Sequence, residues 1–170
     1  MKKIFLSLIV AFSTLSCVQA QKTSFDKEAL NDVMWTTQQK DITFAEILKK
    51  YESKTVVIDV WASWCSDCIK GMPKVKELQK NNPDVVFLFI SMDKTFENWI
   101  VGAEKHELFG EHYMVKDGMK GVFGQSIDLD WIPRYMIVDP NGKIALYKAV
   151  EADDAKIAET LKKLKQKNKR

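Results

Sequence analysis

The chain has 170 residues, and its 26 lysines and arginines nearly balance its 23 aspartates and glutamates. The balance becomes closer without Lys2 and Lys3 of the N-terminal leader, and it gives no reason to expect a nucleic-acid partner. The basic run from Lys162 to Arg170 is typical of a solvated helix end. A chain of this length, without internal repeats or low-complexity linkers, predicts one domain with one core, and we expect a monomer.

The first twenty residues have the layout of a secretory signal peptide. Two lysines precede an apolar run that begins at Ile4, and Val18-Gln19-Ala20 forms a reasonable cleavage site. The run is too short to remain as a membrane-spanning helix, and no second apolar segment of the membrane-spanning kind follows. We therefore expect an exported, periplasmic protein that begins at Gln21. The alternative is a lipid anchor on Cys17, because Leu-Ser-Cys at that point is close to a lipobox.

After the signal peptide (1–20), we expect a lead-in (21–40), one domain (41–165) and a basic tail (166–170). The expected elements are, in chain order, a helix at 43–51, a strand at 55–61, a helix at 65–80, a strand at 84–91, a helix at 95–108, strands at 134–138 and 143–147, and a helix at 152–164. A capping box from Thr43 to Glu46 opens the first helix, and Asp139-Pro140-Asn141-Gly142 marks a tight turn. This order predicts an α/β fold with a central mixed sheet, parallel in its core and antiparallel at one edge, flanked by helices on both faces.

Cys65 and Cys68 are separated by two residues, and several kinds of site use this spacing. A structural disulfide stabilises most when it closes a long loop, and this one would close almost none. Attachment of a c-type haem needs a histidine after the second cysteine, where Ile69 stands. A zinc site would need two further ligands, and His106 and His112, which narrowly miss an HExxH pattern, are expected at the surface. We expect no metal and no cofactor, with zinc kept as an alternative.

Cys65 is predicted to lie where a buried strand ends and a helix begins. The free N–H groups and the dipole at a helix N-terminus stabilise negative charge. A thiol in that position can have a pKa of about 3.5–7.5 instead of about 8.5. Cys68 follows one turn later on the same face, where it can attack a mixed disulfide formed at Cys65. The pair is therefore predicted to be a working dithiol.

The stretch VVIDVWASWCSDCIKGMP resembles the active-site segment of thioredoxins, and the chain resembles the exported thioredoxin-like thiol–disulfide oxidoreductases of the TlpA-like group. The similarity covers roughly residues 41–164 and includes Trp61, the cysteine pair and Pro73. It implies a thioredoxin-like fold that exchanges disulfides with exported proteins and is recharged by a membrane-linked or thioredoxin-type redox partner. Ser66-Asp67 differs from the usual Gly-Pro or Pro-Pro, which leaves the redox potential open.

Asp59 is a carboxylate within a buried apolar strand, which departs from normal strand composition. Desolvation would raise its pKa and make it a proton acceptor near neutral pH. The resemblance implies that Asp59 lies beneath Cys68 and assists its deprotonation. The alternative is that the phase of the strand leaves Asp59 in contact with solvent.

Pro133 stands just before a predicted strand, where an ordinary proline would be a trans strand starter. The resemblance implies instead a cis bond between Ile132 and Pro133 beside the dithiol, with the backbone of Ile132 offered to an extended substrate peptide. We expect Trp64, Ile132 and Pro133 to bind substrate. Trp64 and Trp131 fit either the core or an apolar rim that faces the substrate.

The expected mechanism has two steps, in which the Cys65 thiolate attacks a substrate disulfide and Cys68 resolves the mixed disulfide with Asp59 as proton acceptor. Asp59 and the TlpA-like resemblance favour a reductase. An exported dithiol oxidase or isomerase would share the same residues. A thiol peroxidase would carry Thr-x-x-Cys, where Ala62 replaces the threonine. A non-catalytic binding module is a further alternative, although both cysteines, Asp59 and Pro133 are all present.

Overall fold

The computed structural model describes residues 21–167. The expected signal peptide, the alternative anchor at Cys17 and the last three residues of the basic tail lie outside this described part of the chain. The helices are α1 (Lys27–Asn31), α2 (Phe44–Lys50), α3 (Ser66–Asn81), α4 (Phe96–Lys105), the 3₁₀ helix η1 (Gly118–Lys120), α5 (Val122–Ser126) and α6 (Ala155–Lys167). The strands are β1 (Val33–Thr36), β2 (Asp41–Thr43), β3 (Val56–Trp61), β4 (Val86–Ser91), β5 (Glu111–Val115), β6 (Arg134–Val138) and β7 (Ile144–Ala149).

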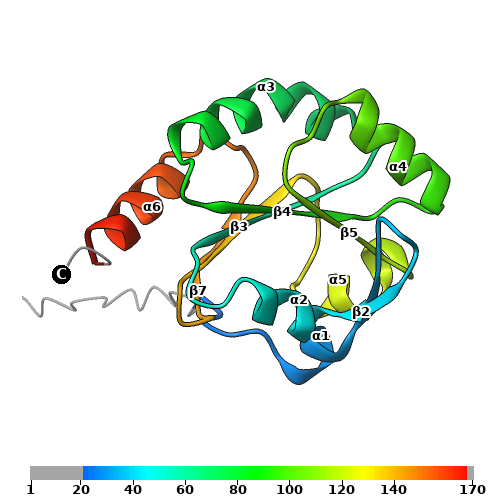
Figure 1. Cartoon of the computed structure of the whole chain (residues 1–170), viewed down its shortest axis with the longest axis horizontal. Helices are drawn as coiled ribbons and strands as arrows, with labels where there is room; N and C mark the ends of the chain where they lie inside the picture. Colours follow the sequence, from blue (N-terminus) through cyan, green and yellow to red (C-terminus); the bar gives the residue numbers. More distant parts are fainter. Residues whose placement is uncertain (1–20, 168–170) are drawn as a thin grey trace, which may run out of the picture.

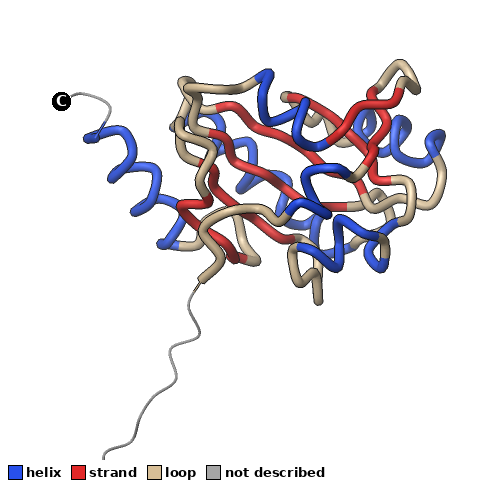
Figure 2. Tube along the Cα trace, turned by 90° about the horizontal axis from the view of Figure 1, so that it is seen from below, coloured by secondary structure: helices blue, strands red, loops and turns tan. Residues whose placement is uncertain are grey.

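The strands form one mixed sheet in the order β2-β1-β5-β4-β3-β6-β7. β3, β4 and β5 are parallel, and an antiparallel pair flanks them on each side. Helices α3 and α4 lie over one face, while α1, α2 and α5 lie over the other (Figure 1). Figure 2 shows the strands running side by side through the middle of the molecule. This is the thioredoxin-like α/β fold expected from the sequence.

The elements at 43–51, 55–61, 65–80, 84–91, 95–108, 134–138, 143–147 and 152–164 all appear, as α2, β3, α3, β4, α4, β6, β7 and α6. The capping box of α2 is present, because Thr43 Oγ1 accepts from Glu46 N at 3.2 Å and Glu46 Oε2 accepts from Thr43 N at 2.8 Å. The expected antiparallel edge is the pair β6 and β7. The additional pair, β1 and β2, was not predicted, since these strands have only four and three residues and weak apolar patterns.

Strand β3 is buried at all six positions. Helices cover both faces of its part of the sheet, so a continuous apolar run is the sequence that such a strand requires. Each fully buried Val or Ile side chain contributes roughly 1.5–3 kcal/mol to this core. Asp59 is the one ionisable residue in the strand, and the fold therefore places it in the interior.

Candidate active site

Cys65 is the N-cap residue of α3, at the point where the chain leaves β3. Its Sγ accepts the backbone N–H of Cys68 at 3.1 Å, so the sulfur takes the place of a capping oxygen. Cys65 and Cys68 are joined by a disulfide and are 5% and 1% exposed. The first sulfur therefore meets the positive end of the helix, where a thiolate is stabilised.

The loop between β3 and α3 is fixed by two residues that the sequence analysis did not identify. The buried Asp93 carboxylate accepts from the backbone N–H of Ser63 at 3.0 Å, from the Ser63 hydroxyl at 2.6 Å and from the Ser91 hydroxyl at 2.7 Å. Gly102 of α4 packs against the same loop, since a Cβ atom on Gly102 would lie 2.4 Å from the Cβ of Ser63. The available signals were an aspartate two residues after a buried strand and a glycine inside a predicted helix.

Asp59 is 2% exposed, so the alternative in which it contacts solvent is wrong. It lies directly opposite Tyr135 in the antiparallel pairing of β3 with β6. Burial raises the pKa of Asp59 to about 8, and the Tyr135 hydroxyl opposes the rise. Among the described residues, Oδ1 of Asp59 has no hydrogen-bond partner. A carboxyl group with such a pKa can accept and release a proton near neutral pH.

Ile132 and Pro133 are joined by a cis peptide bond, as the resemblance implied. The carbonyl oxygen of Ile132 lies 3.6 Å from the Sγ of Cys65. The segment before β6 is thus brought against the N-terminus of α3, although the two are far apart in the sequence. Both residues are buried, so they contribute backbone rather than large side-chain surface to this site.

Trp64 and Trp131 are 54% and 58% exposed, which rules out the core interpretation for both. They line a cavity of about 370 Å³ together with Cys65, Met119 and Ile132. Aromatic side chains at the edge of a cavity offer a large apolar contact area with few rotatable bonds. The surroundings of the dithiol can therefore receive an apolar segment of another molecule.

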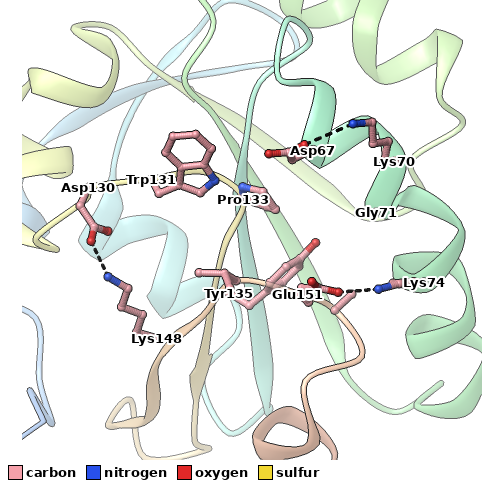
Figure 3. Close-up of a pocket in the computed structure, with 12 residues that line it drawn as sticks. Asp67, Lys70, Gly71, Lys74, Asp130, Trp131, Pro133, Tyr135, Lys148 and Glu151 are labelled. Carbon is pink, nitrogen blue, oxygen red and sulfur yellow. Dashed lines mark hydrogen bonds and ion pairs between the residues drawn. The ribbon is translucent and has the colours of Figure 1, made fainter.

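A second cavity, of about 510 Å³, is lined in part by Pro133 and Tyr135. Figure 3 shows Trp131 and Pro133 above Tyr135, whose hydroxyl is directed toward α3. Trp131 borders both cavities, so the two lie next to each other. Lys74 pairs with Glu151 at the rim of the second cavity.

Arg134, the first residue of β6, is 0% exposed and was not singled out by the sequence analysis. Its guanidinium group donates to the carbonyl oxygens of Ile127 at 3.1 Å and Asp128 at 3.2 Å, and it pairs with Asp130 at 2.5 Å. A buried arginine needs such partners because its charge is strongly desolvated. Arg134 therefore ties the segment that leads to Pro133 onto the sheet.

The expectation that both histidines lie at the surface is wrong for His112. Its ring stacks on Phe89 with 5.0 Å between the ring centroids, and burial lowers its pKa. Its Nε2 lies 2.9 Å from the carbonyl oxygen of Leu108. Within residues 21–167, no three His, Cys, Asp or Glu side chains are grouped closely enough to hold a metal ion.

A protein-family model described as thioredoxin-like matches residues 52–144. The chain belongs to the thioredoxin-like family. Thioredoxin of Geodia cydonium is 37% identical over 75 residues, which cover 44% of this chain and 69% of that protein. Thiol-disulfide oxidoreductase ResA of Bacillus thuringiensis is 25% identical over 144 residues, which cover 85% of this chain and 80% of ResA.

The solution structure of a Bacteroides vulgatus protein, provisionally described as a thiol-disulfide oxidoreductase, is 28% identical. It superposes with a TM-score of 0.66 and the match covers 79% of this chain and 86% of that one. The family member described here is thus a thiol–disulfide oxidoreductase whose CxxC pair is Cys65 and Cys68. Between residues 21 and 167, no helix is both long and apolar enough to cross a membrane.

Proposed function

We propose that this thiol–disulfide oxidoreductase is an exported reductase of protein disulfides, with Cys65 as nucleophile, Cys68 as resolving thiol and Asp59 as proton acceptor. The observation that carries the proposal is the buried Asp59, whose raised pKa of about 8 suits it to receive a thiol proton near neutral pH. Asp59 shares a face of the sheet with Tyr135, whose hydroxyl approaches α3 at Gly71, one turn beyond Cys68.

The reaction begins when the Cys65 thiolate attacks one sulfur of the substrate disulfide. The substrate S–S bond breaks, a mixed disulfide forms at Cys65, and the first substrate thiolate takes a proton from water. Cys68 then gives its proton to Asp59, and the Cys68 thiolate attacks the Sγ of Cys65. The second substrate thiolate leaves and is protonated by solvent. Two electrons have passed from the dithiol to the substrate, and the protein is left with the Cys65–Cys68 disulfide.

Substrate binding is proposed for Trp64, Ile132 and Pro133. Trp64 offers exposed aromatic surface beside Cys65, and Ile132 and Pro133 present backbone next to the sulfur. An extended peptide can pair with such backbone as an added strand. A membrane-linked or thioredoxin-type dithiol partner would then reduce the Cys65–Cys68 disulfide again.

Export is supported by the signal-like pattern of residues 1–20, which lie outside the described part of the chain. Mass spectrometry of the protein purified from its native cells tests this proposal. We expect a mature N-terminus at Gln21. A diacylglycerol group on Cys17 would replace this with a lipid-anchored protein, and an intact Met1 would overturn export altogether.

The direction of the reaction is tested with protein that begins at residue 21. We expect it to catalyse the reduction of insulin disulfides by dithiothreitol, and the matched variants Cys65→Ser and Cys68→Ser to be inactive. Equilibration with glutathione gives the potential: a value near about −270 mV supports a reductase, and one near about −120 mV supports an oxidase. Absence of any turnover in the wild-type protein would favour a binding module.

A further inference from the structure

Tyr135 and Asp59 face each other across the pairing of β6 with β3, and both side chains are buried. On the other side of Asp59, strand β4 places the apolar ring of Phe89 in register with it. The Tyr135 hydroxyl is therefore the polar group that the adjoining strands offer to this carboxyl group at its own level in the sheet. It interacts with the carboxyl group and favours its charged form, while Oδ1 keeps no direct partner among the described residues.

Tyr135 also lines the cavity of about 510 Å³ behind Pro133 (Figure 3). Its hydroxyl oxygen lies 3.9 Å from the position that a Cβ atom on Gly71 would occupy, so it reaches the surface of α3. A cavity of this volume has room for several water molecules, each of which needs about 30 Å³. The tyrosine thus stands between a buried carboxyl group and a space that water can enter.

Resting on the proposed function, in which Asp59 receives the proton of Cys68, the geometry points to Tyr135 as the positioning residue for Asp59. Its hydroxyl orients the carboxyl group and passes the proton on to water in the cavity. The Asp59 carboxyl group gives its proton to the hydroxyl oxygen while the hydroxyl gives its own proton to a water molecule. One proton moves from Asp59 to solvent, no electron moves, and Tyr135 is neutral before and after.

The charges around this pair are compatible with such a role. Burial and the nearby carboxylates raise the pKa of Tyr135, which keeps its hydroxyl protonated throughout. Those carboxylates include Glu151 and Asp153, and both are paired with Lys74 of α3 at the cavity rim, at 2.5 and 3.0 Å. Asp67 and Lys70 of α3 also line the cavity and pair with each other, and Asp130 pairs with Lys148 at its opposite side. Strand β4 contributes only the apolar Phe89 at this level.

The experiment compares the wild-type protein with Tyr135→Phe, which removes the hydroxyl and keeps the ring. In the oxidised full mature chain, the carboxyl ¹³C resonance of Asp59 reports its titration directly. We expect the midpoint in Tyr135→Phe to rise by about one pH unit, because the neighbouring hydroxyl that favours the charged carboxylate is lost. The pH profile of turnover should move in the same direction, and at pH 7 turnover should fall by about tenfold.

Tyr51→Phe is the matched control, because the Tyr51 hydroxyl also pairs with a carboxylate, Glu111, at 2.5 Å. Its Asp59 titration and its turnover profile should match the wild type. In an Asp59→Asn background, Tyr135→Phe should cause no further shift of the turnover profile. The assignment is overturned if the Asp59 midpoint is unchanged in folded Tyr135→Phe. It is also overturned if Tyr135→Phe lowers turnover as much in the Asp59→Asn background as in the wild-type protein.

A second measurement covers the case in which Tyr135→Phe fails to fold. Incorporation of 3-fluorotyrosine leaves the chain otherwise intact, and the ¹⁹F resonance of Tyr135 should move with the same midpoint as the Asp59 carboxyl group. A resonance that stays flat through that pH range overturns the inference. Both titrations are independent of turnover, so a protein without exchange activity would count against the proposed function and not against this contact.

Discussion

The Asp93 carboxylate accepts hydrogen bonds from both the backbone N–H and the hydroxyl of Ser63, at 3.0 and 2.6 Å. A residue that follows β4 thereby holds the loop that leads from β3 to Cys65. The loop keeps its shape through a contact with the segment that follows the neighbouring parallel strand, and the position of the Cys65 sulfur depends on that contact.

Asp93→Ala should destabilise the oxidised protein by about 2–4 kcal/mol, because the buried polar groups of Ser63 and Ser91 lose their acceptor. Urea unfolding followed by tryptophan fluorescence measures the change. Asp117→Ala is the control, since Asp117 is exposed and its side chain caps no helix. Equal stabilities of the two variants would show that the Asp93 contacts do not hold the loop.

Gly102→Ala should also destabilise the protein. Alanine improves helix propensity by up to about 1 kcal/mol, but overpacking against Ser63 costs about 1–3 kcal/mol. Cys65 should react more slowly with substrate because the loop that carries it must shift. Val101→Ala, at an exposed position of the same helix, should leave both properties close to wild type. A more stable Gly102→Ala protein would contradict the close packing of α4 on the loop.

Cys65 should be alkylated at least about tenfold faster than Cys68 in the reduced protein at pH 7. Its sulfur caps α3 and is the less buried of the two, so its thiolate is both stabilised and more accessible. Timed iodoacetamide labelling followed by peptide mass spectrometry measures both rates. Equal rates, or a faster Cys68, would reverse the assigned roles.

Asp59→Asn should slow disulfide turnover at pH 7 by about a hundredfold or less, since water can also take the thiol proton. The deficit should shrink above about pH 8, because Asp59 is then already ionised while the hydroxide that can replace the missing carboxylate continues to increase. Turnover measured from pH 6 to 9 tests this. Unchanged turnover at pH 7 would deny Asp59 a part in proton transfer, and a deficit of constant size at all pH values would indicate a structural role.

The stability of the oxidised protein should fall as the pH rises from about 4 to 8. The pKa of Asp59 is about 8 in the folded protein against an ordinary value of 3.8, so the folded state binds the proton more tightly. The stabilising contribution is complete below the unfolded pKa and is lost as the pH passes through the folded one. The Tm of Asp59→Asn should therefore be equal or higher at pH 8 and vary less with pH. Parallel Tm curves for the two proteins would contradict a buried, titrating Asp59.

The parts of the site that could be predicted are those with local signals. The spacing of Cys65 and Cys68, and a carboxylate inside the apolar run of β3, are visible within a few residues of sequence. Tyr135 could not be predicted in this way, because RYMIV is an ordinary strand sequence. Its importance arises only when β6 pairs with β3 in a register that places it opposite Asp59.

The same distinction holds for the fold. The buried strands β3, β4 and β6 have mainly apolar sequences and were predicted, whereas β5 begins with the exposed Glu111 and the half-buried His112 and was not. The sequence predicted Arg134 only as a strand residue. Its burial depends on oxygen atoms of Ile127, Asp128 and Asp130, which precede the strand. Tertiary packing decides which groups become such partners, and short sequence patterns do not predict it.

The ion pair of Arg134 with Asp130 keeps its charges at all pH values at which the protein is folded, whereas Asp59 does not. A guanidinium group stays charged at any pH at which proteins fold, and Lys148 together with Arg134 holds the pKa of Asp130 at about 2. The contacts of Arg134 that hold the segment before Pro133 consequently persist from acidic to alkaline conditions. Asp59, in contrast, changes its charge in the middle of that pH range. If Asp59 takes the proton of Cys68 as proposed, acidity would change how readily the second sulfur reacts without moving the backbone of Ile132 and Pro133.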